Sequence, residues 1–331
     1  MFAPDLVIRG RRVVTERGMR AAAIHVRHEK IVGVLDYDEV PEGCPVDDAG
    51  DAVVMPGLVD IPLDASTEID VVRRAALAGG ITTIVDAGAC ATRIVSAMPL
   101  APRTSRSWWP RSYAAYLDAL PKSLENDVVA AVLDGCRASR TRTHIVHLSS
   151  SDALAPLFHA RAAQLPVSAS TCPHYLYFAA EEIGGLGARF RCTPPIRGRE
   201  NRELLWAAVA NHLVPAVTAG ERTPLELSLP VTWTAACGRG CTIEQLTQWM
   251  CRAPAQIAGL ARKGRIDVGY DADLVVFRDA AEFTVERSTV RPARGALPYA
   301  GRRLRGVVER TYLGGAALFT RTLLDTAGGQ G

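Results

Sequence analysis

The stretch that decides the fold is residues 56–64, which read Pro-Gly-Leu-Val-Asp-Ile-Pro-Leu-Asp. It follows Val53-Val54-Met55, a short β-branched run typical of a buried strand. A proline and a glycine then interrupt the run, and the stretch ends on the carboxylate of Asp64. We therefore expect Asp64 at the carboxyl end of a strand, which is where barrel enzymes place their chemistry.

Downstream of this stretch the chain alternates between apolar β-type runs and segments with helical spacing of apolar residues. Such alternation indicates a parallel α/β sheet or barrel. The expected strands are residues 81–86, 143–148 and 167–170, and the expected helices are residues 68–78, 124–138, 151–164, 199–212 and 242–252.

Both ends of the chain differ in sequence pattern from the middle. They consist of short β-type runs joined by turns, without helical periodicity. The runs are residues 6–10, 23–26, 30–35, 264–277 and 306–313. We predict one small β domain built from residues 1–52 plus 262–320, a barrel over residues 53–261, and a tail at 321–331.

The middle of the chain is short for a complete barrel. A (β/α)8 barrel takes about 250 residues, whereas Val53 to Gly259 holds about 205. The shortage of predicted strands and helices lies in Ala87–Arg142. A segment there is rich in Pro, Arg and Ser and carries Trp108-Trp109, which would form an exposed apolar patch or a cover over the gap in the barrel. The predicted fold class is α/β, a reduced or incomplete (β/α) TIM-like barrel with the appended β domain. Strand edges left unpaired need a cover, so we expect an oligomer or a protein partner.

Composition is that of a globular protein, with 48% hydrophobic and 22% charged residues. A net charge of +3 is too small to indicate nucleic acid or membrane partners. The eight cysteines are scattered without a C-x-x-C pair, which favours free thiols in a reducing compartment. Without a signal-type amino terminus or an apolar run of membrane-spanning length, we expect a cytoplasmic protein.

Several strings stand in a fixed order along the chain: Pro56–Asp64, Ala78–Asp86, Arg111–Leu117, His144–Ser150, Thr171–Leu176, Cys192–Arg197 and Gly264–Leu274. The first resembles the signature P-G-x-x-D-x-H-x-H of metal-dependent cyclic amidohydrolases. Together the strings resemble allantoinases, within the family that also holds dihydroorotases and hydantoinases. The resemblance runs from about residue 5 to 320 with internal gaps. It implies the barrel fold and hydrolysis of cyclic amide or ureide C–N bonds.

The resemblance also implies a set of metal ligands, most of which this chain lacks. The family uses two histidines after the first barrel strand, a bridging carboxylated lysine, two further histidines and an aspartate, which together activate a water. The first pair is replaced here by Pro62 and Asp64, and the aspartate position by Ala219. Lys122 is the only lysine in the relevant span, and it stands in a turn that leads into a helix. His147 matches a ligand position, so the two-metal site is expected to be degenerate.

The remaining candidate catalytic residues are Asp64, His147 and His174. Asp64 and His147 would be ligands of a single Zn²⁺ with His174 nearby, or a metal-free general acid–base pair. Alternatively, His147 is an inherited core residue and Asp64 caps a helix. Arg197 and Asn201 are candidates for clamping an anionic ligand, with a solvated loop as the other interpretation.

Three functions stay open. The first is a hydrolase of cyclic ureides or related amides that works through a rebuilt site, with no cofactor or one zinc. The second is an inactive subunit or scaffold of an active enzyme. The third is a binder of a small cyclic amide or ureide that does not turn it over.

Overall fold

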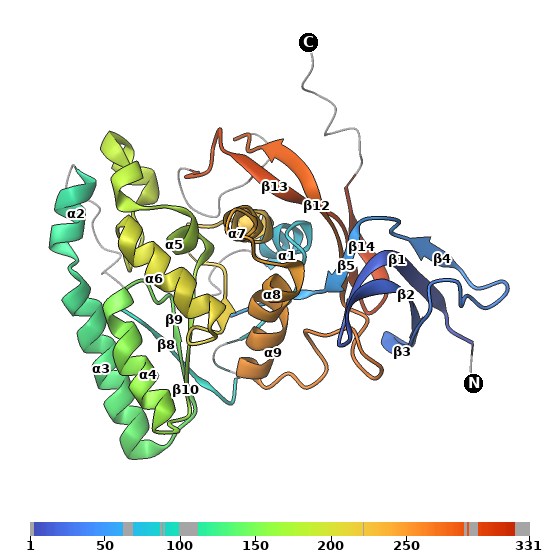
Figure 1. The fold of residues 1–331 in the computed structure, drawn as a ribbon, viewed down its shortest axis with the longest axis horizontal. Coiled ribbons are helices and arrows are strands. Elements are labelled where there is room, and N and C mark those ends of the chain that lie inside the picture. The colour runs from blue at the N-terminus through green and yellow to red at the C-terminus, as the bar shows by residue number, and fades with distance from the viewer. Residues whose placement is uncertain are drawn as a thin grey trace, which may run out of the picture.

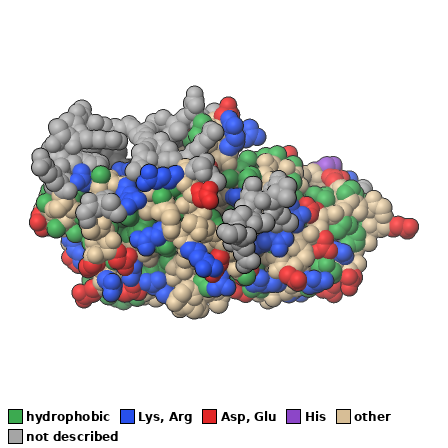
Figure 2. Space-filling view, turned by 90° about the horizontal axis from the view of Figure 1, so that it is seen from above, with side chains coloured by type: hydrophobic (Ala, Val, Ile, Leu, Met, Phe, Trp, Pro, Cys, Tyr) green, Lys and Arg blue, Asp and Glu red, His purple; other side chains and the backbone are tan. Residues whose placement is uncertain are grey.

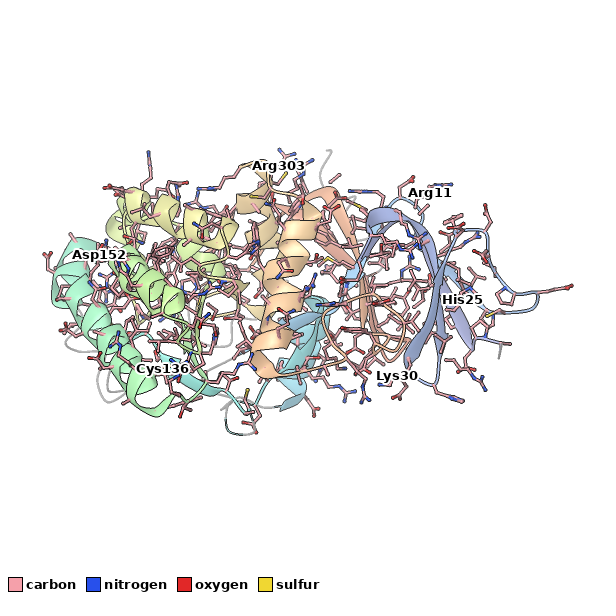
Figure 3. The ribbon with its side chains drawn as sticks, turned by 60° about the horizontal axis from the view of Figure 1, so that its bottom comes forward. Arg11, His25, Lys30, Cys136, Asp152 and Arg303 are labelled. Carbon is pink, nitrogen blue, oxygen red and sulfur yellow. The ribbon has the colours of Figure 1, made fainter. Side chains whose placement is uncertain are left out.

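The structure is a computed structural model that describes residues 3–61, 69–86, 88, 90–98, 112–220, 222–287, 290 and 297–321. Asp64 and Pro62 lie outside the described residues, as do Trp108 and Trp109. The molecule is elongated, with strands β1 to β4 at one end and helices α2 to α4 at the other (Figure 1). Figure 3 marks the two ends, with Arg11, His25 and Lys30 on the strand side and Cys136 and Asp152 on the helix side.

Strands from both ends of the chain share one eight-stranded sheet, in the order β14-β13-β12-β5-β1-β2-β3, with β4 beside β1. Val7, Ile8, Ile24 and Val276 are among its fully buried apolar residues. The apolar positions of the terminal runs therefore build a common core. The strands are β1 (Leu6–Thr15), β2 (Gly18–Arg27), β3 (Lys30–Leu35), β4 (Val46–Asp48), β5 (Val53–Pro56), β12 (Leu274–Thr284), β13 (Arg303–Leu313) and β14 (Ala316–Thr320).

One strand serves a different sheet from the expected one. Residues 53–56 form a fully buried strand, as the sequence predicts, but β5 pairs with β1 and with β12. The strand of the α/β part is the next one, β6 (Leu58–Asp60). Gly57 separates the two, and a Cβ added to it would lie 2.2 Å from Thr82 Oγ1. The chain can turn from one sheet to the other only because this residue has no side chain.

The α/β part consists of short parallel strands in two groups. β6 pairs with β7 (Ile81–Ile84), and the four-stranded sheet has the order β11-β10-β9-β8. Its strands are β8 (Arg93–Ser96), β9 (Thr143–Val146), β10 (Val167–Thr171) and β11 (Ala216–Val217). Within the described ranges these strands do not close into a barrel. The fold class is the predicted incomplete TIM-like α/β fold.

Helices pack around these strands. In Figure 1, α3 and α4 lie side by side along one flank of β8, β9 and β10. The expected helix 124–138 is α3, which already begins at Lys122, and the helix expected from 151 begins as a short 3-10 turn capped by Ser150. The helices are α1 (Ile69–Ala78), α2 (Tyr113–Ala119), α3 (Lys122–Ser139), α4 (Leu154–Ala162), α5 (Pro173–Tyr177), α6 (Arg199–Ala210), α7 (Ser228–Cys237), α8 (Ile243–Thr247), the π-turn Gln248–Arg252 and α9 (Ala253–Ala258).

The two groups of parallel strands meet at Asp60. Its Oδ1 accepts a hydrogen bond of 2.7 Å from the backbone N–H of Ala219, which follows β11. The Asp60 side chain lies among Leu58, Ile81 and Met250 and is only 4% exposed. Burial raises the pKa of this carboxyl to about 7, against the opposing hydrogen bonds from the N–H groups of Ala219 and Ile61. The join between the sheets is thus made by a carboxyl group in an apolar setting.

The described part of the chain contains no helix that is both long enough and apolar enough to cross a membrane. On the face shown in Figure 2, basic and acidic side chains interleave, as expected for a chain with a net charge of +3.

We predict that Asp60→Asn changes how stability depends on pH. A carboxyl in the unfolded chain titrates at about 4, whereas Asp60 titrates at about 7 in the folded protein. The stability that this group contributes is therefore fully present below pH 4 and is lost as the pH rises to 7. Asn mimics the protonated acid at every pH. The free energy of unfolding of Asp60→Asn relative to the wild type should rise by about 1.4 kcal/mol per pH unit across this window.

Urea unfolding at half-unit steps from pH 4.5 to 8 measures this difference. Asp134→Asn is the matched control, because that carboxylate is 75% exposed on α3 and its curve should run parallel to the wild type. A difference between Asp60→Asn and the wild type that does not vary with pH would contradict a buried acid with a raised pKa.

Candidate functional site

His147 lies directly after β9, at the carboxyl ends of the parallel strands. The β-branched and apolar residues of β9 are fully buried and hold the strand in the core. His147 then takes a left-handed backbone conformation with φ of 63°, which is unusual for a residue with a side chain. The ring is buried, with 6% exposure, and makes no hydrogen bond to any residue that the structure describes. Backbone strain and an unused polar ring coincide here, which is typical of functional positions.

His174 stands one strand further along, in the turn that follows β10. Pro173 occupies the first turn of α5, where its missing N–H costs nothing, so the helix begins at once and holds His174 at the strand end. Nδ1 of His174 lies 3.2 Å from Thr223 Oγ1, and Thr223 in turn contacts the Tyr299 hydroxyl at 2.9 Å. Nε2 of His174 is buried without a hydrogen-bond partner among the described residues. A buried polar atom left unpaired is costly, so it marks a place for a ligand or water.

Both imidazoles are neutral at pH 7. Burial lowers the pKa of His147 to about 4. The pKa of His174 lies well below its ordinary value, first through burial and then through the nearby charges of His147 and Arg222. Each ring therefore offers one N–H donor and one nitrogen acceptor. His147 follows β9 and His174 follows β10, and these two strands pair in parallel, so both residues lie at the same edge of the sheet.

A layer of hydrogen-bonded polar groups lies beneath them between the strands. His144 bonds Ser168 Oγ at 2.8 Å through Nδ1 and Ser170 Oγ at 3.1 Å through Nε2. Ser170 continues to Thr218 Oγ1 at 3.2 Å, which reaches the residue after β11. Burial lowers the pKa of His144 to about 3, so this ring is also neutral. Its nitrogens are both used within the protein, so His144 connects strands and is not available to a ligand.

The loop after His147 is fixed by a buried carboxylate. Glu125 on α3 has no exposed surface and accepts from the N–H groups of Ser149 and Ser150 at 2.7 and 2.8 Å, and from Ser149 Oγ at 2.8 Å. Burial raises the pKa of Glu125, while these hydrogen bonds and the charge of Arg197 oppose that rise. The Arg197 guanidinium lies 3.7 Å from the carboxylate. This ion pair holds the loop two residues from His147.

The predicted anion clamp consists of residues that contact the protein itself. Asn201 uses both ends of its amide, accepting from Ser151 N–H and donating to the Ser149 carbonyl, each at 2.8 Å. Arg197 donates to the Leu120 carbonyl at 2.7 Å, while its Nε and Nη2 have no hydrogen-bond partner in the described ranges. Both residues therefore shape the loop beside His147. Their binding of a ligand stays a prediction.

The described residues do not fit the two-metal centre that the sequence resemblance implies. Among them, no group of three or more His, Cys, Asp or Glu side chains is arranged to hold a metal ion. Lys122, in the span of the bridging lysine, instead donates to Ser151 Oγ at 3.0 Å and to Asp152 at 2.8 Å at the start of α3. Ala219 has no metal-binding atom in its side chain, and its backbone N–H donates a hydrogen bond to Asp60. Pro62 and Asp64 fall outside the described ranges, so the predicted Asp64–His147 pairing stays a prediction.

Sequence reasoning did not single out Asp60, Glu125 or His144. Asp60 belongs to the quoted stretch, two residues before Pro62, and its position at a strand end was the available signal. Glu125 follows the Pro121-Lys122 helix start and reads as an ordinary first-turn acid. Its pairing with a loop 24 residues away carries no local sequence signal.

Comparison with known proteins places this geometry in context. Residues 143–315 match the model of the Amidohydrolase family. The chain is 31% identical to an allantoinase of Streptomyces avermitilis, over 94% of each chain. That alignment spans 421 positions against the 331 residues of this chain, so at least 90 positions are gaps in it. An allantoinase of Arabidopsis thaliana is 36% identical over 63% of the chain, which spans about half (48%) of that relative.

Solved structures show the same fold. An L-hydantoinase from Arthrobacter aurescens superposes with a TM-score of 0.83 at 20% identity, covering 97% of this chain and 96% of that one. A D-hydantoinase superposes with a TM-score of 0.81 at 18% identity, covering 96% and 95%.

The order of the strands, the histidines at their carboxyl ends and the composite β sheet thus have one common explanation. The chain belongs to the amidohydrolase family, as an internally shortened member that is similar to allantoinases.

Proposed function

We propose that this protein binds a small cyclic ureide or cyclic amide at the carboxyl ends of β9 and β10 and does not perform two-metal hydrolysis. The observation that carries the proposal is the buried Nε2 of His174, which has no hydrogen-bond partner among the described residues. Ureides and cyclic amides present N–H donors and carbonyl acceptors side by side. Two neutral imidazoles with unused nitrogens match that pattern without any charge.

The relatives support this class of ligand. Proteins named allantoinase are similar to this chain, and proteins named hydantoinase or dihydropyrimidinase share its fold. Arg197 supports the same assignment, because its Nε and Nη2 have no hydrogen-bond partner among the described residues, with Nη2 held 3.7 Å from the Glu125 carboxylate. We assign it the carbonyl oxygen or carboxylate of the ligand, with Asn201 holding the loop in place.

Binding is favoured over turnover by the protonation state of His147. A general base works best when its pKa lies near the working pH. Burial holds the pKa of His147 at about 4, which makes its imidazole a weak base at pH 7. Metal-free hydrolysis by an Asp64–His147 pair is therefore the second candidate, and one zinc held by Asp64, His147 and His174 is the third.

The unpaired sheet edges favour an alternative function, in which the protein is an inactive subunit bound to a partner. In the described ranges, β7 pairs only with β6, and β8 pairs only with β9. Each strand thus has one edge without a strand neighbour, and exposed edges pair readily with other chains. We propose that a second copy or a partner protein completes the structure at these edges.

Ligand binding is tested by thermal shift and calorimetry on protein treated with EDTA, using allantoin, hydantoin and dihydroorotate. At a concentration 100 times the dissociation constant, a bound ligand should add about 2.7 kcal/mol to the free energy of unfolding. His174→Ala should weaken binding by at least about tenfold, the loss of one hydrogen bond to a buried group. Titration of the two imidazoles should add no pH dependence to the affinity near pH 7, because burial lowers the pKa of His147 to about 4 and that of His174 well below its ordinary value.

The control for this test is His159→Ala, an exposed histidine on α4 that follows neither strand end. Gly220→Ala is a second site variant, since a Cβ there would lie 2.7 Å from His174 Cε1 and displace the ring. If none of the three compounds stabilises the wild type, or if His174→Ala binds as the wild type does, the proposed ureide site is wrong.

Metal content is measured by mass spectrometry on protein purified without chelator. We expect far less than one zinc per chain, because the described residues supply no group of three ligands. Stoichiometric zinc that disappears in His147→Ala would establish the rebuilt single-metal site instead, and cyclic amides should then be screened for turnover.

Oligomeric state is measured by size-exclusion chromatography with light scattering. Protein concentration is varied over an interval of about 1 to 100 µM, because self-association depends on the concentration of the protomer. The edge proposal predicts a dimer or a larger assembly, or a stable complex with a co-purified protein. A monomer without any bound protein over the whole interval would contradict it.

A further inference from the structure

A cavity opens at the opposite end of the same strands from His147 and His174. It is lined by the residues that precede or begin β9, β10 and β11, together with the π-turn and α9, and its volume is about 600 Å³. Small-molecule sites typically measure about 300 to 1,000 Å³. The cavity therefore has room for one metabolite, and it is separate from the proposed ureide site.

Three arginines from three separate parts of the chain line this cavity. Arg142 precedes β9, Arg161 belongs to α4, and Arg252 ends the π-turn. His212 lies beside them, and the lining contains no Asp or Glu. Positive charge is thus concentrated in the cavity, although the whole chain carries a net charge of only +3.

Two of the three guanidinium groups, those of Arg142 and Arg161, are held in place without being neutralised. Arg142 donates to the carbonyl of Gln256 at 2.7 Å. Arg161 donates to the carbonyls of His212 and Leu213, the latter at 3.1 Å. Carbonyl oxygens fix the position of a guanidinium but carry no net charge. Each group keeps further N–H donors in a planar fork, which suits the oxygens of an anion.

Arg252 has a partial counter-charge. Its Nη1 lies 3.6 Å from the carboxylate of Glu16, which also pairs with Arg265 at 3.4 Å. One carboxylate is therefore shared by two arginines, and an excess of positive charge remains. An open, half-solvated cavity with uncompensated guanidiniums attracts anions by its field as well as by direct hydrogen bonds.

We propose that this cavity binds a small phosphorylated metabolite whose phosphate group lies between Arg142, Arg161 and Arg252. A carboxylate presents two oxygens and satisfies one guanidinium fork, whereas a phosphate presents three terminal oxygens and up to two negative charges. The apolar surfaces of Leu165 and Ile257 then face the organic part of the ligand. The site is independent of the proposed ureide site, so both can be filled in one molecule.

Isothermal titration calorimetry with inorganic pyrophosphate and inorganic phosphate tests the site, with citrate as the carboxylate probe. We expect one pyrophosphate per chain, binding at least tenfold more tightly than citrate, and weaker binding at higher salt. Arg142→Gln and Arg161→Gln should each weaken pyrophosphate binding at least tenfold. Arg137→Gln is the matched control, because that arginine is exposed on α3 and pairs with Asp134.

A second measurement does not depend on the folding of variants. Wild-type protein is modified with phenylglyoxal with and without pyrophosphate, and the modified arginines are mapped by mass spectrometry. Arg142 and Arg161 should be protected by pyrophosphate, while Arg137 should react equally in both samples. Absence of binding at millimolar pyrophosphate, equal protection of Arg137, or citrate binding as tight as pyrophosphate would each overturn the proposal.

Discussion

The hydrogen bond from the Ala219 N–H to Asp60 Oδ1 is the contact on which the arrangement of the parallel strands depends. β6 and β7 form a two-stranded pair beside the four-stranded sheet, and this bond, together with the packing of β6 against the π-turn and α9, joins the pair to that sheet. The contact has an electrostatic cost, because burial raises the pKa of the Asp60 carboxyl to about 7. The two groups of parallel strands are thus joined through a carboxyl group whose charged form would be more stable in solvent.

The same contact sets the position of the candidate site. Once Ala219 is fixed by Asp60, the next residue, Gly220, packs against the residues that follow β10. A Cβ at Gly220 would come within 2.6 Å of Cys172 Sγ and 2.7 Å of His174 Cε1, so the backbone itself supports the His174 ring. On the other side, Glu125 fixes the loop after His147 through three hydrogen bonds. Both imidazoles are therefore positioned by buried carboxyl groups that do not touch them.

The sequence pattern predicted those strands and turns that interactions between neighbouring residues determine. β7, β9 and β10 are runs rich in β-branched or apolar residues, and the turn Cys172-Pro173 places His174 at the carboxyl end of β10. Pattern did not separate β5 from β6, because both are buried and only strand pairing distinguishes them. The hydrogen bonds of Glu125 and Asp60 join residues that are 24 and 159 positions apart. The ion pair of Arg197 depends on the position of Glu125. Hydrophobic periodicity carries no information about contacts between residues so distant in sequence.

The two ends of the parallel strands have opposite electrostatic character, and this constrains what the protein can bind. At the carboxyl ends, burial keeps the histidines uncharged, so a neutral, hydrogen-bonding ligand fits best. At the amino ends, the hydrogen-bond partners of Arg142 and Arg161 are carbonyl groups, which bring no counter-charge. A strand of four residues separates the ends by about 13 Å. The charge of Arg142 contributes to the lowered pKa of His144 within β9, whereas burial is what lowers the pKa of His147 at the carboxyl end. Each end can therefore select its ligand by charge while His147 stays neutral.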